Sequence, residues 1–459
     1  MKMPWKRKEE KKDGSLFDVD VKAKRIEGVE TLKASRLAAL ALEHCRDILA
    51  ACPQRMAGSA SSRTAAHMIR DILADQSDDC VITSVRCDER GYMGCLRLIA
   101  ICAPVMLILC WIGFPSIALL VSILSSLYLW NVFFLCRPTR RILERRVDMT
   151  NVHATIEPEG EVRHTIVFSA HHDSARMMNV PPGDRNAMLL SLYAPLVHFI
   201  VLAMTSLSLF VSEVFSGDLL RFNPPPLSMG VLLALLTISA PLHWRLFTLV
   251  GGQCSPGAGD NLVSCAILCT LARYFHWRKE SGHGLADTRL VFASFDGEEC
   301  GLCGSNAWYG SHRDLCRDAV VLNIDSPLRS SDLVVLTKDV NGLVDLSSLL
   351  ASEVCQVAGS MGYEVRTGSL PLMGGASDAA SAARAGLEAV TLMGIPLSGA
   401  ASDVIHTKED TLDKLDQHTL EEVVSICIKF VESRAGSRED TEDAKAPALQ
   451  DQSRRFSLR

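Results

Sequence analysis

RLVFASFDGEECGLCGS, residues 289–305, sets the pattern by which the rest of the chain can be interpreted. Its mostly apolar first part, 289–295, predicts a buried strand, and the polar turn that follows carries the adjacent acids Glu298 and Glu299. A helical pattern begins at residue 303, directly after this turn. A strand, a polar turn and a helix in this order indicate a unit of an α/β fold.

The same alternation recurs along the chain. Further apolar strand candidates are 165–170, 319–325, 332–337 and 388–394, and helical patterns cover 34–78 on both sides of the turn RMAGS (55–59), 261–276, 303–311, 343–360, 376–386 and 417–434. Strands that alternate with helices predict a three-layer α/β fold, in which helices cover both faces of a mostly parallel sheet.

Composition limits the class of protein. The chain has 459 residues and a net charge of −6, which gives no indication of a nucleic-acid partner. The 16 cysteines are scattered, and several lie inside apolar runs, which favours a reducing compartment over a disulfide framework. The N-terminus is basic but no apolar segment follows it, so we do not expect a cleaved signal peptide.

Four charge-free apolar runs explain the hydrophobic content of 48%. Residues 98–136 would span about 58 Å as one helix, roughly twice a bilayer core, and Gly113 and Pro115 near the middle predict a hairpin instead. Residues 187–212 and 226–244 form a second pair. The alternative is a set of buried core helices, but four such runs are hard to bury in a soluble domain.

Flanking charge predicts the sidedness of these four spans. The arginines beside the hairpin ends are Arg97, Arg137, Arg140, Arg141, Arg145, Arg146, Arg185 and Arg245, and the loop 213–225 carries Glu213, Asp218 and Arg221. The positive-inside rule then places the turns outside and the rest of the chain in the cytoplasm. We therefore expect a multi-pass membrane protein whose catalytic domain faces the cytoplasm and whose hairpins contact the lipid bilayer.

The predicted organisation divides the chain into seven parts. These are a basic, loosely ordered N-terminus (1–33), a first domain segment (34–95), transmembrane hairpin 1 (96–136), a second domain segment (137–186), transmembrane hairpin 2 (187–250), a third domain segment (251–434) and a disordered tail (435–459).

Polar residues gather at the ends of the predicted strands, where open α/β sheets place their sites. They are His171 with Asp173, Asp260 in the turn SPGAGDN, the pair Glu298 and Glu299, Asp325, and His406 in a late loop. A carboxylate two residues from a histidine can orient the imidazole of a metal ligand. Two imidazoles and several carboxylates without a thiolate suit two hydrolytic zinc ions, so the residues alone predict a metal-dependent hydrolase.

The motifs sharpen this interpretation. AHxDS, GAxDN, EExGLxGS, NxD, SD and HTxxDT occur in this order, and the series resembles the co-catalytic zinc aminopeptidases of metallopeptidase family 28. That family also includes glutamate carboxypeptidases, glutaminyl cyclases and the transferrin-receptor ectodomain. The resemblance runs from RMAGS to about residue 434 and leaves out both apolar hairpins.

The resemblance implies a role for each motif residue. Asp260 would bridge two zinc ions, or two ions of another divalent metal such as Co²⁺ or Mn²⁺. His171 and Asp325 would complete one site, and Glu299 and His406 the other. Glu298 would be the general base and Asp173 would orient His171. Ser377 and Asp378 match the SD motif, for which a structural or substrate-proximal role is expected.

The expected function is hydrolysis of peptides at their N-terminal residue by a metal-activated water. A glutaminyl cyclase, a carboxypeptidase and a non-catalytic membrane scaffold on the same fold are the alternatives, although a scaffold predicts eroded ligand positions. Two roles for the hairpins stay equally open. They could hold the site at the bilayer face, where it would act on apolar peptides, or they could simply anchor an enzyme whose substrates are soluble peptides. Because His171 and Asp260 must meet at one centre, the chain between them has to cross the bilayer an even number of times or not at all.

Two further pairs have plainer explanations. Cys300 and Cys303 form a CxxC beside the acidic pair, and small residues at a helix start are favoured over a redox or metal role. His198 and His243 lie in or beside apolar runs, and packed or interfacial histidines are favoured there.

Overall fold

The computed structural model describes residues 29–89, 91–137, 146–181, 183–217, 225–397 and 403–436. The predictions for residues 1–28 and for the tail from residue 437 therefore lie outside the described residues. So do the flanking residues Arg140, Arg141 and Arg145 and the loop residues Asp218 and Arg221.

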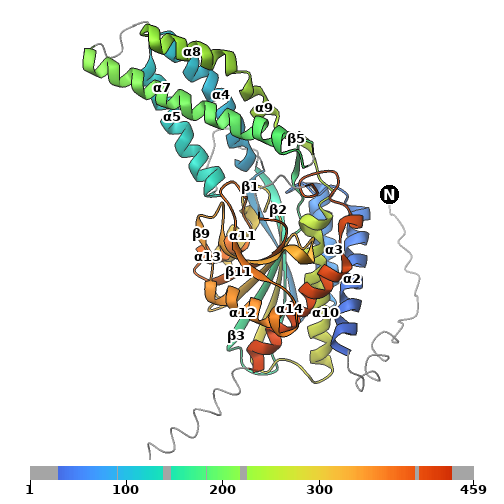
Figure 1. The fold of residues 1–459 in the computed structure, drawn as a ribbon. Helices are drawn as coiled ribbons and strands as arrows, with labels where there is room; N and C mark the ends of the chain where they lie inside the picture. Colours follow the sequence, from blue (N-terminus) through green and yellow to red (C-terminus); the bar gives the residue numbers. More distant parts are fainter. Residues whose placement is uncertain are drawn as a thin grey trace, which may run out of the picture.

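A nine-stranded sheet forms the centre of the described structure (Figure 1), with the strand order β1-β2-β6-β3-β7-β11-β8-β10 and with β9 paired to β8. Its strands are β1 (Asp79–Asp88), β2 (Arg146–Ile156), β3 (His164–His171), β6 (Thr288–Phe295), β7 (Val320–Asp325), β8 (Leu333–Asp339), β9 (Val344–Asp345), β10 (Arg366–Ser369) and β11 (Glu388–Gly394).

The four central strands β6, β3, β7 and β11 are parallel to one another. Antiparallel pairs join β1 to β2, β2 to β6 and β8 to β11, so the sheet is mixed and its parallel part lies at the centre. Parallel strands end at the same edge of a sheet, and this edge receives the polar turns after β3, β6 and β7. All five predicted strands are present.

Helices cover both faces of the sheet, which confirms the predicted α/β class (Figure 1). One face packs against α2 (Val29–Ala51), α3 (Ala60–Ala74), α10 (Val263–Glu280), α12 (Ser348–Ser360) and α14 (Gln417–Gly436). The other face packs against α11 (Cys303–Ser311) and α13 (Ala379–Arg384). Branched and aromatic strand residues fill both interfaces, as in the stacked rings of Phe168 and Phe292 with centroids 5.8 Å apart.

The apolar runs form a helical bundle that extends from one end of the sheet domain (Figure 1). Its first hairpin is α4 (Gly91–Trp111) and α5 (Pro115–Leu129), which a π-helical turn extends to Phe134. Its second hairpin begins with the short α6 (Arg185–Met188) and a π-helical turn, followed by α7 (Ala194–Ser216), α8 (Leu227–Ser239) and α9 (Leu242–Thr248). Buried residues of α4, α5, α7, α8 and α9 form one apolar core.

Not all of these helices are long enough to cross a lipid bilayer by themselves. Three helical segments, Tyr92–Trp111, Pro115–Phe134 and Arg185–Ser216, are long and apolar enough to cross a bilayer. The fourth predicted run, 226–244, becomes α8 and α9, which meet at an angle of 41° and together are long and apolar enough for a broken fourth span or a re-entrant loop. Pro241 stands at the start of α9, and proline ends or bends a helix because it removes an internal hydrogen bond.

A small two-stranded sheet joins the two chain segments that lead into and out of the second hairpin. Strand β4 (Arg176–Met178) pairs antiparallel with β5 (Val250–Cys254). The backbone nitrogen of Asn179 donates to the carbonyl oxygen of Leu249 at 2.7 Å, which extends the contact toward the bundle. The bundle is therefore held between the chain that follows β3 and the turn that carries Asp260.

Several sequence predictions need correction. Strands β1 and β2 were not predicted, and the first helix begins at Val29 instead of residue 34. The helix predicted at 343–360 begins at Ser348, because the hydroxyl of Ser347 accepts a hydrogen bond from the backbone nitrogen of Leu350 and caps it there. Arg97 lies inside α4 and does not flank it, since that helix already begins at Gly91.

Candidate metal centre

The carboxyl edge of the parallel strands positions the first group of polar side chains. His171 is the last residue of β3 and pairs in register with Phe295, the last residue of β6. The neighbouring strand β7 ends at Asp325. The turn after β6 brings Glu298 and Glu299 to the same edge, so four predicted site residues meet because their strands are parallel neighbours.

Asp260 lies between the two imidazoles. Its Oδ1 is 3.3 Å from Nε2 of His171, and its Oδ2 is 3.1 Å from Nε2 of His406. His406 reaches this position from a late loop with a positive φ of 59°. Each oxygen of one carboxylate thus faces a different histidine, as a carboxylate shared between two metal positions requires.

Among the described residues three groups of donor atoms could each hold a metal ion: His171 with Glu298 and Glu299, and two triads that share Asp260. His171, Asp260 and Asp325 form one triad, and Asp260, Glu299 and His406 form the other, with donor atoms within 4.8 Å of one another in each. Glu298 is adjacent to the first triad, with its Oε2 3.9 Å from Nε2 of His171. The structure therefore brings together all five residues that the sequence suggested as metal ligands, together with the suggested general base.

Burial makes these acids costly without added positive charge. Burial raises the pKa of Asp325 to about 7, and burial among neighbouring carboxylates also raises the pKa of Glu298 and of Glu299. Burial opposes the charged form of Asp260 too, but hydrogen bonds with His171 and His406 lower its pKa overall.

The two histidines show the complementary shift. Burial disfavours their charged forms, yet Glu298 beside His171 and Glu299 beside His406 outweigh it and raise the pKa of each imidazole. Without a metal ion, these buried carboxylates are stabilised only by the protons that they and the two imidazoles hold. A bound cation would supply the positive charge that the cluster lacks. Divalent zinc prefers this mixture of nitrogen and oxygen donors, so the residues present fit the group that the motifs imply.

Asp173 supports the centre from behind. Its side chain is fully buried, and its Oδ1 lies 3.4 Å from Nδ1 of His171. Its two carboxylate oxygens also accept hydrogen bonds from the backbone nitrogens of Glu298 and Glu299, both at 3.2 Å. One carboxylate therefore orients an imidazole and fixes the turn that carries both acids.

Three supporting residues were missed in the sequence, although each lies inside or beside a quoted motif. Asp410 of HTKEDT accepts from the backbone nitrogens of Gly259 and Asp260 at 2.6 and 3.1 Å. Asp296, before the acidic pair, accepts from the backbone nitrogen of Thr150 and the hydroxyl of Ser62. Only their positions within motifs could have indicated these roles.

Arg55 of RMAGS is the third supporting residue. Its guanidinium is fully buried and donates to the backbone carbonyl oxygens of Cys52, His172, Pro256 and Gly257 at 2.6–3.2 Å. Gly257 has a φ of +63°, and a Cβ there would lie 2.6 Å from the side chain of Ser174. The buried cation thus joins three chain segments around the loop that leads to Asp260.

The remaining candidates lie outside both triads. Nδ1 of His172 is 2.8 Å from the hydroxyl of Ser294. Ser377 donates its backbone and hydroxyl hydrogens to Asp339, and Asp378 is fully buried, which raises its pKa to about 7.

The cysteines and the bundle histidines take up packing roles. All 16 cysteines are free thiols. Cys303 starts α11 and packs against Ala57 and Met149, in agreement with the plainer explanation of the CxxC. Nε2 of His243 lies 2.8 Å from Nδ1 of His198, whose own Nε2 lies 2.9 Å from the carbonyl oxygen of Leu236, so these histidines bond to each other inside the bundle.

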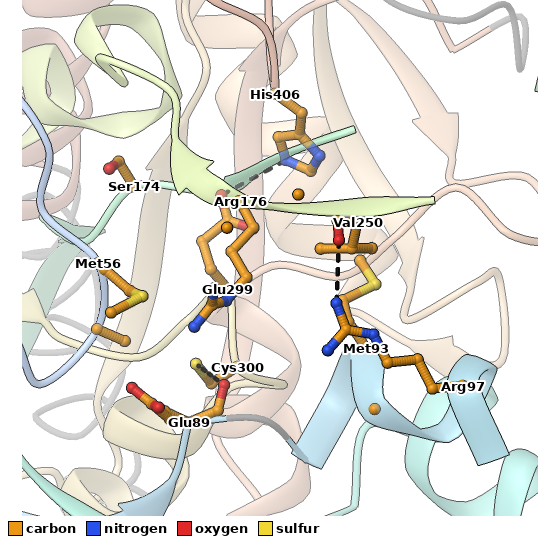
Figure 2. A pocket seen from close by; sticks show the side chains of 14 residues that line it. Met56, Glu89, Met93, Arg97, Ser174, Arg176, Val250, Glu299, Cys300 and His406 are labelled. Carbon is orange, nitrogen blue, oxygen red and sulfur yellow. Dashed lines mark hydrogen bonds and ion pairs between the residues drawn. The ribbon is translucent and has the colours of Figure 1, made fainter. Parts of the chain in front are cut away.

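A cavity of about 240 Å³ opens beside the second triad (Figure 2). Glu299 and His406 form part of its wall. The other lining residues come from the RMAGS turn, the segment before α4 and its first turns, the segment after β3, the ladder strands and the turn after β6: Met56, Ala57, Glu89, Met93, Gly94, Arg97, Ser174, Arg176, Val250, Gly251, Gly252 and Cys300.

Comparison with known proteins agrees with this geometry. The sequence model of peptidase family M28 matches residues 243–431, a range that contains Asp260, Glu298, Glu299, Asp325 and His406. No curated protein matches the chain significantly.

Solved structures share the fold at low sequence identity. The LapA aminopeptidase of Legionella pneumophila aligns with a TM-score of 0.50 at 11% identity, over 90% of this chain and 75% of that one. A glutaminyl cyclase of Porphyromonas gingivalis aligns with a TM-score of 0.50 at 13% identity, over 86% of this chain and 98% of that one. The family match and the shared fold agree with the resemblance drawn from the motifs: the chain has the α/β fold of these structures, and its residues 243–431 are similar to peptidase family M28.

Proposed function

We propose that this chain is a membrane-anchored, two-metal exopeptidase that removes the N-terminal residue of peptides. The observation that carries the proposal is the pair of donor triads that share Asp260. One triad alone would suit a single ion, and a shared carboxylate between two imidazoles suits a pair of zinc ions or of another divalent metal such as Co²⁺ or Mn²⁺.

His171, Asp260 and Asp325 would hold one ion, and Asp260, Glu299 and His406 the other. Ions bound there would acidify a water molecule and polarise the scissile carbonyl. Asp173 keeps His171 and the acidic turn in place throughout, because it contacts the imidazole and both backbone nitrogens.

Glu298 is the proposed general base. It is 9% exposed, borders the first triad and belongs to neither shared-Asp260 triad. Its carboxylate would take a proton from the attacking water and then deliver it to the leaving amine nitrogen. Its backbone nitrogen is held by Asp173, so the side chain has a fixed origin from which to reach both groups.

The helical bundle is the proposed membrane anchor, and the sheet domain is proposed to lie in the cytoplasm. Large apolar side chains of the bundle are exposed on its outside, among them Leu124, Val197, Met204, Leu235 and Ile238, each with at least 47% of its surface accessible. Exposed large apolar side chains on α5, α7 and α8 are typical of helices that contact lipid. Arginines at the hairpin bases favour the cytoplasmic side.

The test of the catalytic proposal is hydrolysis of unblocked dipeptides and aminoacyl-arylamides by the full-length protein in detergent with added zinc. We expect a chelator to abolish turnover and Glu298→Gln to lower kcat roughly 10²- to 10⁴-fold while zinc content stays unchanged. Conversion of N-terminal glutamine to a cyclic product with release of ammonia, without peptide hydrolysis, would establish the cyclase alternative instead. Hydrolysis restricted to the C-terminal residue of blocked peptides would establish a carboxypeptidase.

The test of the anchor is separate. After extraction of membranes at alkaline pH, the protein should remain in the pellet. A fluorescent protein fused after residue 459 should fluoresce, and an alkaline phosphatase fused at the same place should stay inactive, since that enzyme requires export. Release into the supernatant would contradict the anchor, and an active phosphatase fusion would contradict the cytoplasmic orientation.

A further inference from the structure

The cavity beside the second triad is built by two different parts of the molecule. Glu299 and His406 come from the sheet domain, whereas Met93, Gly94 and Arg97 come from the start of α4. Val250, Gly251 and Gly252 come from β5, the strand on which the second hairpin returns. The bases of both hairpins therefore line the space in which a substrate would lie against the metal centre (Figure 2).

The size of the cavity limits what it can hold. At about 240 Å³ it lies below the roughly 300–1,000 Å³ that is usual for small-molecule sites. A single side chain or a very short peptide fits such a volume, and a long peptide does not. Selectivity would therefore depend on the few charged groups that line the cavity.

Arg176 is the notable charge among them. It lies on β4, three residues after Asp173, and its partly buried side chain lines the cavity (Figure 2). Within the described ranges its guanidinium makes neither a hydrogen bond nor an ion pair with any other residue. The backbone of Arg176 is fixed, because it pairs with Cys254 in the β4–β5 ladder.

The second arginine of the cavity is engaged elsewhere. Arg97 donates from Nη2 to the carbonyl oxygen of Val250 at 3.0 Å, and its guanidinium lies 5.8 Å from the ring centre of Phe247. Glu89 brings one negative charge to the wall, but it is only 6% exposed. If Glu299 is counted with the metal centre, the cavity wall carries two guanidinium groups and one carboxylate, so its net charge is positive.

We propose that Arg176 is a specificity-determining residue that selects substrates with a carboxylate group. A guanidinium presents a planar fork that matches a carboxylate, and a half-buried one without a partner gains most from such a pair. The carboxylate would come from an acidic N-terminal side chain or from the free C-terminus of a dipeptide. This inference rests on the proposed peptidase function and identifies the substrate class of that site.

The experiment measures kcat/KM of the full-length, zinc-loaded protein in detergent on two matched substrate pairs. The first pair differs in the N-terminal side chain, Glu against Gln, on an arylamide that has no C-terminal carboxylate. The second pair is a neutral dipeptide with a free C-terminus against the same dipeptide amide. The variants are Arg176→Gln, Arg176→Lys and, as a charge-matched control, Arg317→Gln, whose side chain is 75% exposed.

The expected result is a wild-type preference for the carboxylate member of at least one pair. The pair that shows the preference identifies the source of the carboxylate. Arg176→Gln should lower kcat/KM for that member roughly 10- to 100-fold, mostly through KM, and change the neutral member less than about threefold. Arg176→Lys should retain part of the preference for the carboxylate substrate, because lysine keeps the positive charge but lacks the planar, bidentate guanidinium group. Arg317→Gln should behave as wild type.

Three outcomes would overturn the proposal. They are no wild-type preference within either pair, an equal loss on both members of a pair in Arg176→Gln, and a loss confined to kcat. If Arg176→Gln does not fold, Arg176→Lys serves the same purpose, since an undiminished preference in that variant contradicts recognition by the guanidinium fork. Hydrolysis without preference refutes only this inference, whereas absence of hydrolysis of every peptide refutes the proposed function.

Discussion

Asp410 holds Asp260 in place: its Oδ2 accepts a hydrogen bond from the backbone nitrogen of Asp260 at 3.1 Å, while its Oδ1 accepts one from Gly259 at 2.6 Å. The two residues are 150 positions apart in the chain. The proposed bridging carboxylate is thus fixed through its own backbone by an acid from the loop that also supplies His406. The two triads depend on each other through this contact.

The first prediction concerns this contact. Asp410→Asn replaces one acceptor oxygen by an amide group that faces a backbone N–H, so at least one of the two hydrogen bonds is lost. Loss of such a supporting interaction typically weakens metal binding about 10- to 100-fold. Zinc affinity measured by competition with a chromophoric chelator should fall by that factor. Asp413→Asn, in the exposed part of the same loop, should bind zinc as wild type, and equal affinities for the two variants would refute the role of Asp410.

Asp173 carries the second prediction. Asp173→Asn keeps the size of the side chain but puts an amide where two backbone nitrogens and the imidazole of His171 need acceptors. We expect zinc affinity and kcat each to fall about 10- to 100-fold, because both the ligand and the acidic turn lose their orientation. Equilibrium dialysis with zinc and turnover of an arylamide measure the two effects. Asp148→Asn, an exposed acid on β2, is the control, and a variant with full zinc affinity would show that the imidazole does not need this partner.

Arg55 carries the third prediction, which concerns stability. Arg55→Met removes the guanidinium donor from four carbonyl oxygens, of which only that of Gly257 keeps a backbone donor among the described residues, the nitrogen of Leu262 at 3.3 Å. Each orphaned group costs about 1–3 kcal/mol, so the free energy of unfolding should fall by about 3 kcal/mol or more. In detergent the thermal midpoint should drop by roughly 6–12 °C. Arg63→Met, on the exposed face of α3, should shift it by less than about 2 °C, and similar midpoints for both variants would contradict the role of the buried guanidinium.

Gly252 provides the fourth prediction, which tests the cavity independently of charge. A Cβ at Gly252 would meet no atom within 4 Å, and the residue lines the cavity, so a larger side chain can enter the space without disturbing the fold. Gly252→Leu should raise KM for dipeptides about tenfold or more and leave zinc content unchanged. Gly310→Leu, which has equal room but lies on α11 away from the cavity, is the matched control. An unchanged KM in Gly252→Leu would show that substrates bind elsewhere.

The sequence predicted the central strands well because their burial leaves long apolar runs. It failed for β2, whose buried residues include Asn151 and His153. These polar residues are satisfied by distant partners: Asn151 donates to the carbonyl oxygen of Gly304, and His153 accepts from the indole of Trp308. Residues 151–156 do alternate polar side chains with the core residues Val152, Ala154 and Ile156, but this pattern is short and lacks the continuous apolar run of the central strands.

The candidate site was accessible from sequence for a different reason. His171, Asp260, Glu299, Asp325 and His406 lie in short motifs at strand ends or turns, and the strands converge at one edge. Arg176 lies in no sequence motif. Its proposed role is apparent only from the structure, where its side chain lines the cavity and makes no ion pair with a described residue. Arg97 was misplaced because a charge was assumed to end an apolar helix, whereas its long side chain leaves α4 sideways to reach Val250.

The β4–β5 ladder has a consequence for how the second hairpin joins the domain. Residues 179 and 249 are joined by a hydrogen bond, so everything between them departs from and returns to the domain within a single strand spacing of about 4.8 Å. To the rest of the domain, a stretch of any length grafted at this point looks like a tight surface turn. A single insertion between residues 179 and 249 therefore suffices to add the second hairpin to a chain of this fold, and it leaves the two donor triads that share Asp260 in place.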